Sequence, residues 1–222
     1  MKDFVHLHVH TEYSLLDGAI RIKDLVEQAK QYGMKSVAIT DHGVMYGAIS
    51  FYKEAVKNGI KPILGCEIYT AKRTRFDKQS GIDSEQGHLI LLAKNNTGYK
   101  NLMRLVSAGF IEGFYYRPRI DMDILKEHNE GLIALSACLS GDIPYEILNN
   151  NYEAAKKKAV LYNEIFGQDN FFLELQINGI EEQVYVNQSL IKISKETNIP
   201  VVATTDAHYL RREDARAHEI LL

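Results

Sequence analysis

The 222-residue chain has only two cysteines, Cys66 and Cys138, and it has no long apolar run. Two thiols cannot build the disulfide framework of a small secreted domain, so a reducing, cytoplasmic environment is the simplest expectation. The first residues lack the apolar segment of a signal peptide. One of the longest apolar runs, residues 89–93, is far too short to cross a membrane. The sequence therefore predicts a cytoplasmic protein with no membrane partner.

An excess of basic residues is also lacking. The formal net charge is -3, which argues against a domain that binds duplex DNA by itself through a broad basic surface. Nucleic acid delivered to a local metal centre is not excluded by this charge. With 45% hydrophobic residues, the chain can build one substantial core, so we expect a single domain over residues 1–222.

Short apolar segments alternate with longer amphipathic ones along the chain. Seven strand-then-helix units favour parallel strands, because each helix returns the chain to begin the next strand in the same direction. We expect a distorted seven-stranded (βα)7 barrel rather than an open doubly wound sheet, because the candidate metal ligands follow strand ends all along the chain and a closed barrel brings these ends to one rim. A polar segment, residues 72–86, is expected to be an inserted loop. The expected strands are residues 4–8, 36–40, 61–69, 88–93, 131–136, 171–175 and 201–205, and the expected helices are 22–32, 47–57, 99–111, a region ending at 166, 183–197 and 213–222.

Two pairs of metal-ligand residues stand at opposite ends of the chain. His8 and His10 are two residues apart, so on a strand their side chains point to one face and one metal ion can take both. Asp206 and His208 repeat this spacing after the last predicted strand. The first and last strands of a closed barrel are neighbours, so the two pairs are expected to meet. His6 has the same parity but lies deeper, and we interpret it as a core or supporting histidine.

Other ligand-type residues occur singly. His42 leaves a strand at the expected rim, where Asp41 either caps the following turn or orients a neighbouring histidine. Glu67 is an acidic residue inside an apolar strand, and its carboxylate has two oxygens that can bridge two ions. Cys66 faces the other way and is expected to be an inert packing residue. Two further candidates, His88 at the beginning of a strand and Cys138 in an apolar segment, fit a rim site poorly when spacing alone is considered.

Several motifs resemble the polymerase and histidinol phosphatase (PHP) family: His8-Val9-His10-Thr11, Ile39-Thr40-Asp41-His42, Gly65-Cys66-Glu67 and Thr205-Asp206-Ala207-His208. The longer segments of residues 4–18, 113–119 and 135–141 resemble the branch of the family that is found at the beginning of bacterial replicative DNA polymerase chains. The resemblance implies a barrel with three divalent ions, of zinc, manganese or iron. It implies that one ion is bound by His8, His10, Glu67 and Asp206, a second by Asp17, His42 and His208, and a third by Glu67, His88 and Cys138.

The resemblance also implies an activity. We expect a metal-dependent phosphodiesterase that removes nucleotides from a DNA 3′ end, a 3′–5′ exonuclease of the proofreading type, with Asp206 and Glu67 at the reacting centre. Arg117 is expected to bind a phosphate, and Arg119 and the cations of residues 72–75 are further candidates. The helical pattern of residues 213–222 has no stop signal, so a longer chain with polymerase domains is expected to follow.

Two other functions remain open at this point. One is a structural or docking module of the polymerase that uses any metal only to hold its fold. The other is a small-molecule phosphomonoesterase, which is disfavoured because such family members commonly carry histidine where this chain has Asp17 and Cys138.

Overall fold

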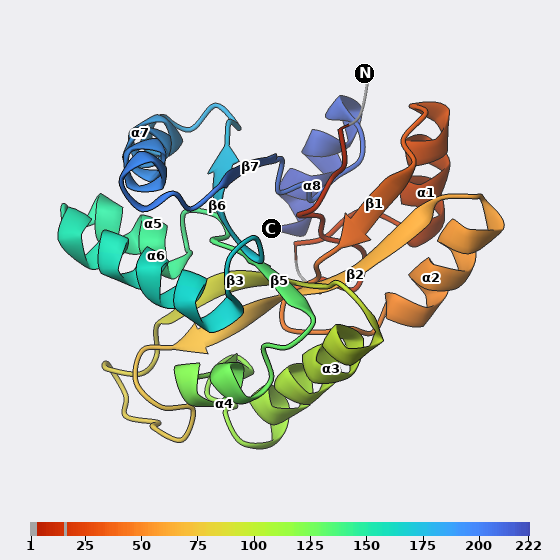
Figure 1. Ribbon diagram of the computed structural model, residues 1–222. Coiled ribbons are helices and arrows are strands. Elements are labelled where there is room, and N and C mark those ends of the chain that lie inside the picture. Colours follow the sequence, from red (N-terminus) through yellow and green to blue (C-terminus); the bar gives the residue numbers. More distant parts are fainter. Residues whose placement is uncertain (1–3, 16) are drawn as a thin grey trace.

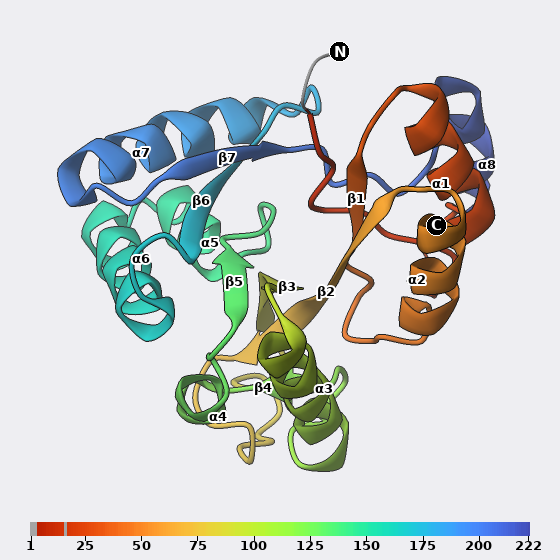
Figure 2. The same cartoon turned by 45° about the vertical axis from the view of Figure 1, so that its right-hand side comes forward.

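A curled sheet surrounded by helices forms the molecule in the computed structural model, which describes residues 4–15 and 17–222 (Figure 1). The strands follow one another in the spatial order β1-β2-β3-β5-β6-β7, and the short β4 pairs with β2. Figure 2 shows these strands arranged around an arc with the helices outside it. The strands are β1 (Ser36–Ile39), β2 (Lys61–Ala71), β3 (Gln86–Ala93), β4 (Arg119–Ile120), β5 (Leu132–Leu135), β6 (Phe171–Gln176) and β7 (Val201–Thr204).

The segment before the first helix joins the two ends of this sheet. On one side, Ala38 N donates to His6 O and Thr40 N donates to Val9 O, at 2.9 and 2.8 Å. On the other side, His10 N donates to Ala207 O at 2.8 Å. Residues 6–10 therefore fill the place of the first predicted strand, although they pair only at isolated positions. The predicted fold class, a distorted seven-stranded α/β barrel, is confirmed.

The helices cover the outside of the sheet because each buries one apolar face against it. The larger core cluster includes Leu89 and Leu91 of β3, Phe171 of β6, and Leu102 and Leu105 of the helix that follows β3. All the predicted helices are present within one to three residues at their ends, and the short α4 and β4 escaped prediction. The helices are α1 (Ile22–Gln31), α2 (Ala48–Lys57), α3 (Asn96–Ile111), α4 (Met122–Glu127), α5 (Asp142–Leu148), α6 (Tyr152–Phe166), α7 (Glu181–Thr197) and α8 (Ala215–Leu221), with a 3-10 turn η1 (Arg212–Asp214).

One strand runs against the expected direction. We predicted parallel strands throughout, but β3 is antiparallel to both β2 and β5. The reason is the connection: residues 72–85 contain no helix or strand, so β2 is followed directly by a strand that returns alongside it. The beginning of β3 therefore lies at the same rim as the ends of the parallel strands, and His88 pairs with Tyr69 near the end of β2.

None of the helices in the described part of the chain is long and apolar enough to cross a membrane.

Candidate metal centre

Glu67 stands at the centre of the rim. It lies on β2 with its side chain fully buried, and the chain leaving β1 pairs with it: Glu67 N donates to Asp41 O at 3.2 Å, and Gly43 N donates to Glu67 O at 2.8 Å. This pairing places His42 beside the carboxylate, with Nδ1 2.6 Å from Oε2. Three more histidines surround the same carboxylate: His10 Nε2 at 3.3 Å, His8 Nε2 at 3.6 Å and His88 Nδ1 at 2.9 Å.

The two pairs from the chain ends meet next to Glu67, as we predicted. His8 Nε2 and His10 Nε2 lie 3.1 Å apart, and Asp206 Oδ1 lies 3.1 Å from the first and 3.3 Å from the second. The backbone of Asp206 is in the left-handed region, with φ of 49°, and this turn directs its carboxylate back over the histidines. These three ligand atoms lie within 4.8 Å of one another.

A second group contains Asp17, His42 and His208. His42 Nε2 lies 2.9 Å from Asp17 Oδ2, and the ring of His208 stacks on that of His10 with centroids 4.2 Å apart. The loop that carries Asp17 is held beside His208, because Ala19 N donates to His208 O at 2.8 Å. The nitrogens of His10, His42 and His208 also lie within 4.8 Å of one another.

The third group depends on the antiparallel strand. His88 Nδ1 lies 2.9 Å from Glu67 Oε1 and 3.7 Å from Cys138 Sγ. The Cys138 loop is fixed there because His88 N donates to Ser140 O at 3.1 Å. The two residues that fitted a rim site poorly by sequence therefore lie beside the others, and all nine candidate ligands are brought together.

Three carboxylate oxygens of the site have no hydrogen-bond donor among the described residues, and a divalent cation would satisfy them. Asp17 Oδ1, Glu67 Oε2 and Asp206 Oδ1 are buried, yet none accepts a hydrogen bond from the described residues. Buried polar atoms are normally paired, and two of these oxygens, Glu67 Oε2 and Asp206 Oδ1, lie close to histidine nitrogens, so they point to ligands of a shared cation. Burial also raises the pKa of the Cys138 thiol, and the nearby charge of Glu67 raises it further. A neighbouring cation would favour the thiolate instead.

Burial and neighbouring charges shift the pKa values of the side chains in this site in different directions. Burial lowers the pKa of His10 to about 4, so this ring is neutral. Burial also opposes the charged form of His42, but the carboxylates of Asp17 and Glu67 outweigh it and raise the pKa of His42 to about 10. For Asp206, burial is outweighed by His8 and His10, which lower the pKa of this carboxyl to about 2.

Glu174 is a member of the site that our sequence reasoning missed. It lies buried on β6, and its Oε1 accepts a 2.6 Å hydrogen bond from His8 Nδ1. Thr204 and Gln176 donate to the same oxygen. An acidic residue inside the apolar run of residues 171–176 is the signal that identified Glu67, and it applies equally here.

Asp41 supports the site through a loop. It accepts from Thr11 N at 2.6 Å and from Ser14 Oγ at 2.9 Å, and Ser14 Oγ lies 3.0 Å from His10 Nδ1. Of the two interpretations left open, the structure supports orientation of a histidine, although that histidine is His10.

His6 and Cys66 lie outside the cluster, as we predicted. His6 Nδ1 contacts Thr205 Oγ1 at 2.8 Å. The Cys66 thiol is fully buried in the core and donates to Asp41 O at 3.3 Å.

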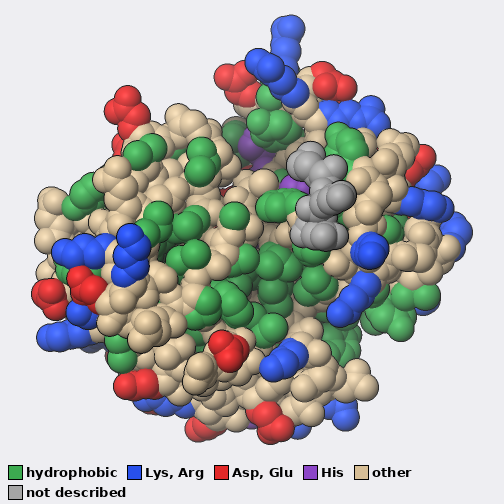
Figure 3. All heavy atoms as spheres, turned by 45° about the horizontal axis from the view of Figure 1, so that its top comes forward, with side chains coloured by type: hydrophobic (Ala, Val, Ile, Leu, Met, Phe, Trp, Pro, Cys, Tyr) green, Lys and Arg blue, Asp and Glu red, His purple; other side chains and the backbone are tan. Residues whose placement is uncertain are grey.

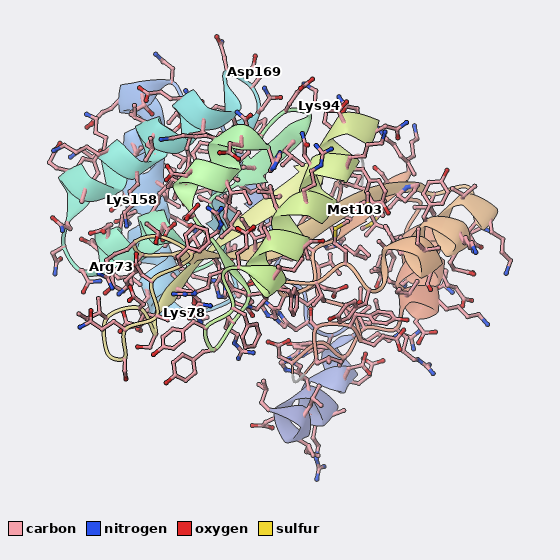
Figure 4. All side chains as sticks on the ribbon, turned by 90° about the horizontal axis from the view of Figure 1, so that it is seen from below. Arg73, Lys78, Lys94, Met103, Lys158 and Asp169 are labelled. Carbon is pink, nitrogen blue, oxygen red and sulfur yellow. The ribbon has the colours of Figure 1, made fainter. Side chains whose placement is uncertain are left out.

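Of the cations that we expected to bind phosphate, only Arg117 lines the cavity beside His42. Arg119 as a phosphate ligand is wrong: it is fully buried and donates to the carbonyls of Gly113, Asp83 and Asp77 at 3.1, 2.9 and 2.8 Å, so it holds the inserted loop. The cations of residues 72–75 are paired with carboxylates. In Figure 4, Arg73 of this loop lies on the same side of the molecule as Lys158 of α6, and both line one cavity that is separate from the cavity at His42. Arg117 lines a cavity together with Asp17 and His42.

The fold and the cluster define an α/β barrel whose rim gathers side chains of the types that can bind metal ions. The chain belongs to the PHP domain family, because the family model matches residues 6–178. This match confirms the resemblance drawn from the motifs.

Relatives with known names cover the whole chain. It is 53% identical over 220 residues to the DNA polymerase III subunit alpha of Borreliella burgdorferi and 49% identical over 223 residues to that of Thermus aquaticus, in each case over 99% of this chain. The chain spans only 19% and 18% of these relatives.

Solved structures share the fold at low identity. A Bifidobacterium adolescentis protein, whose predicted class is metal-dependent phosphoesterase, matches with a TM-score of 0.56 at 15% identity, over 100% of this chain and 97% of the other. A two-domain protein of Bacteroides vulgatus that contains a predicted PHP-like metal-dependent phosphoesterase matches with a TM-score of 0.56 at 16% identity, over 92% and 51%.

Proposed function

We propose that this domain is a metal-dependent phosphodiesterase that removes nucleotides from the 3′ end of DNA, as part of a replicative polymerase chain. The observation that carries the proposal is the position of Glu67, a fully buried carboxylate in contact with four histidines from three separate segments of the chain. So many ligand atoms around one carboxylate favour a site with several ions over a single structural ion.

The residues would divide into three ligand sets. His8, His10, Glu67 and Asp206 would hold one divalent ion, Asp17, His42 and His208 a second, and Glu67, His88 and Cys138 a third, with Glu67 bridging. The mixture of nitrogen, oxygen and sulfur donors admits zinc, manganese or iron. When bound, such ions make hydroxide available near neutral pH and neutralise charge on a phosphate ester.

The protein's own groups position the substrate and its surroundings. Glu67, which is fully buried, and Asp206, whose side chain is partly exposed, supply negative charge at the centre. Arg117 would bind a non-bridging phosphate oxygen through its guanidinium. Glu174 holds His8 with Nε2 facing the site, and Ser14 does the same for His10.

The relatives support the choice of substrate. Both relatives described above are named DNA polymerase III subunit alpha, so a DNA 3′ end and the remaining polymerase domains are the expected partners. Asp17 and Cys138, where small-molecule phosphatases commonly have histidine, favour the diester over a phosphomonoester. A structural module that binds metal without hydrolysis is the competing function.

The test is nuclease activity on a 5′-labelled single-stranded oligonucleotide with added manganese or zinc. Asp206→Asn is the test variant, because asparagine tolerates the left-handed backbone at this position. Asp123→Asn, at an exposed position on α4, is the matched control. Shortening from the 3′ end that disappears only in Asp206→Asn supports the proposal. A folded, metal-loaded parent that shortens no DNA would favour the structural module.

A further inference from the structure

Beside the metal centre lies a cavity whose aromatic side chains have no role in the proposed chemistry. This cavity of about 270 Å³ opens next to Asp17 and His42, and most of the rest of its lining is aromatic. Tyr46, Phe114 and Tyr116 form its outer part, and Arg117 lies beside them. Figure 3 shows histidine side chains reaching the surface next to hydrophobic ones on the same face of the molecule.

These three aromatic side chains are open to solvent although they line one cavity. Tyr46 is 61% exposed, Phe114 49% and Tyr116 64%. Exposed apolar surface costs about 25 cal/mol per Å² relative to burial. Three exposed aromatic side chains beside one site therefore indicate a binding surface. Their rings are held by neighbours rather than free: Phe114 stacks on Phe110 with centroids 6.2 Å apart, and Tyr116 lies edge-on to Tyr115 at 4.7 Å.

The backbone holds Tyr116 outward at a conformational cost. Its φ is 60°, a value that non-glycine residues seldom adopt, and Tyr115 N donates to Arg117 O at 3.0 Å across the turn. Strained residues of this kind cluster at ligand sites. The turn also leads directly into Arg117, so the aromatic ring and the guanidinium lie on the same short segment.

Arg117 differs from the arginines near it. Its guanidinium lies over the ring of Tyr69, 5.8 Å from the centroid. Within residues 4–15 and 17–222, its side chain makes no hydrogen bond or ion pair, whereas Arg73 and Arg75 pair with carboxylates. A cation without an anionic partner, next to flat apolar rings, matches the alternation of phosphate and base in a nucleic acid strand.

We propose that Tyr46, Phe114 and Tyr116 form a stacking platform for the unpaired bases of a single-stranded DNA 3′ end, with Arg117 on the phosphate between them. This inference rests on the proposed function and specifies its substrate. A base in a duplex has its faces covered, and exposing it costs a few kcal/mol, so the platform selects frayed or single-stranded ends. Aromatic rings accept every base, so no sequence preference is expected.

The experiment measures binding separately from hydrolysis. Fluorescence anisotropy at low salt compares a 5′-labelled single-stranded oligonucleotide with one whose last two 3′ nucleotides are abasic, so that only the bases differ. The test variant is Phe114→Leu/Tyr116→Leu, which keeps apolar side chains but removes the rings. Tyr52→Leu, a 50% exposed tyrosine on α2 that does not line the cavity, is the matched control. Circular dichroism checks that each variant is folded.

For the parent and Tyr52→Leu, we expect the end that lacks two bases to bind about 30-fold more weakly, the lower limit for the loss of two stacked bases. In the double variant this ratio should fall toward one. An equal ratio in the parent and the double variant, or a parent that does not distinguish the two ends, would overturn the platform. Base-dependent binding without shortening of the DNA would uphold the platform while rejecting the exonuclease. Shortening without base dependence would reject the platform alone.

Discussion

The Nδ1 atom of His8 lies 2.6 Å from Oε1 of Glu174, and both side chains are fully buried. Because the Nδ1–H group donates a hydrogen bond to this carboxylate, Nε2 is the atom that faces Asp206 and His10. A contact on β6 therefore fixes the tautomer and the ring orientation of a histidine at the other end of the chain, and it raises the basicity of the nitrogen in the site.

Removing this carboxylate should weaken metal binding. Glu174→Gln keeps an acceptor but loses its charge, and we expect an approximately 10–100-fold lower affinity for zinc or manganese, with a larger loss for Glu174→Ala. Isothermal titration calorimetry measures the effect, with Glu153→Gln, at an exposed position on α6, as the control. Unchanged affinity in Glu174→Ala would show that His8 is oriented by its packing alone.

Metal binding should also depend on pH through His42. The charged form of His42 stabilises the metal-free protein; this contribution is full below pH 6.5 and is lost as the pH rises through about 10. A cation must displace this proton, so its affinity should increase between these values, by up to about tenfold per pH unit for each proton released. Calorimetry in buffers of different ionisation enthalpy counts the protons.

His42→Gln is the informative variant for this pH dependence, and His128→Gln, at the end of α4, is the control. The first should release fewer protons and show a shallower pH dependence, whereas the second should behave as the parent. A pH-independent affinity in the parent would mean that His42 does not hold the displaced proton.

Much of this site could be predicted because strand geometry is visible in sequence. The spacing of two in His8/His10 gave a shared face, and closure of the barrel brought Asp206 and His208 to this pair. Strand spacing does not explain the second pair, because both residues follow the end of β7 and Asp206 has a left-handed backbone. His88 could not be placed in this way, because periodicity carries no information on strand direction. Its position depends on residues 72–85, which lack a helix and so reverse the strand.

Arg117 and Arg119 show a second limit. Their spacing of two predicts a common face, but only Arg119 belongs to β4, and Arg117 still lies in the turn that begins with the left-handed Tyr116. One guanidinium consequently points to the cavity and the other into the protein. Glu174, in contrast, was detectable from its apolar surroundings in sequence.

The two cysteines offer a matched pair of substitutions. Cys138→Ala should lower the number of bound metal ions by one, because it removes a ligand from the set with Glu67 and His88. Cys66→Ala should leave the number unchanged and only lower the melting temperature, because this thiol packs in the core. Elemental analysis of the purified proteins gives both numbers. Equal metal content in all three proteins would remove Cys138 from the ligand set.

Substitution of the two neighbouring arginines should have opposite consequences. Arg117→Gln removes a guanidinium that faces the cavity, so kcat/KM on a 3′ end should fall about 10–100-fold, the value of a hydrogen bond to a charged group. Its melting temperature should change by about 2 °C or less, as for other surface positions. Arg119→Gln leaves the carbonyls of Gly113, Asp83 and Asp77 without their donor, so the free energy of unfolding should fall by about 3 kcal/mol or more.

Thermal unfolding and steady-state kinetics on both variants separate these effects. Arg119 donates its hydrogen bonds to the carbonyls of Gly113, Asp83 and Asp77 and not to a candidate metal ligand, so Arg119→Gln protein that remains folded at low temperature should keep its catalytic rate. If Arg119→Gln lost activity at full stability, or Arg117→Gln lost stability at full activity, the assignment of the two guanidinium groups would be reversed. Because the two residues are separated only by Pro118, such a result would also require a different turn at Tyr116.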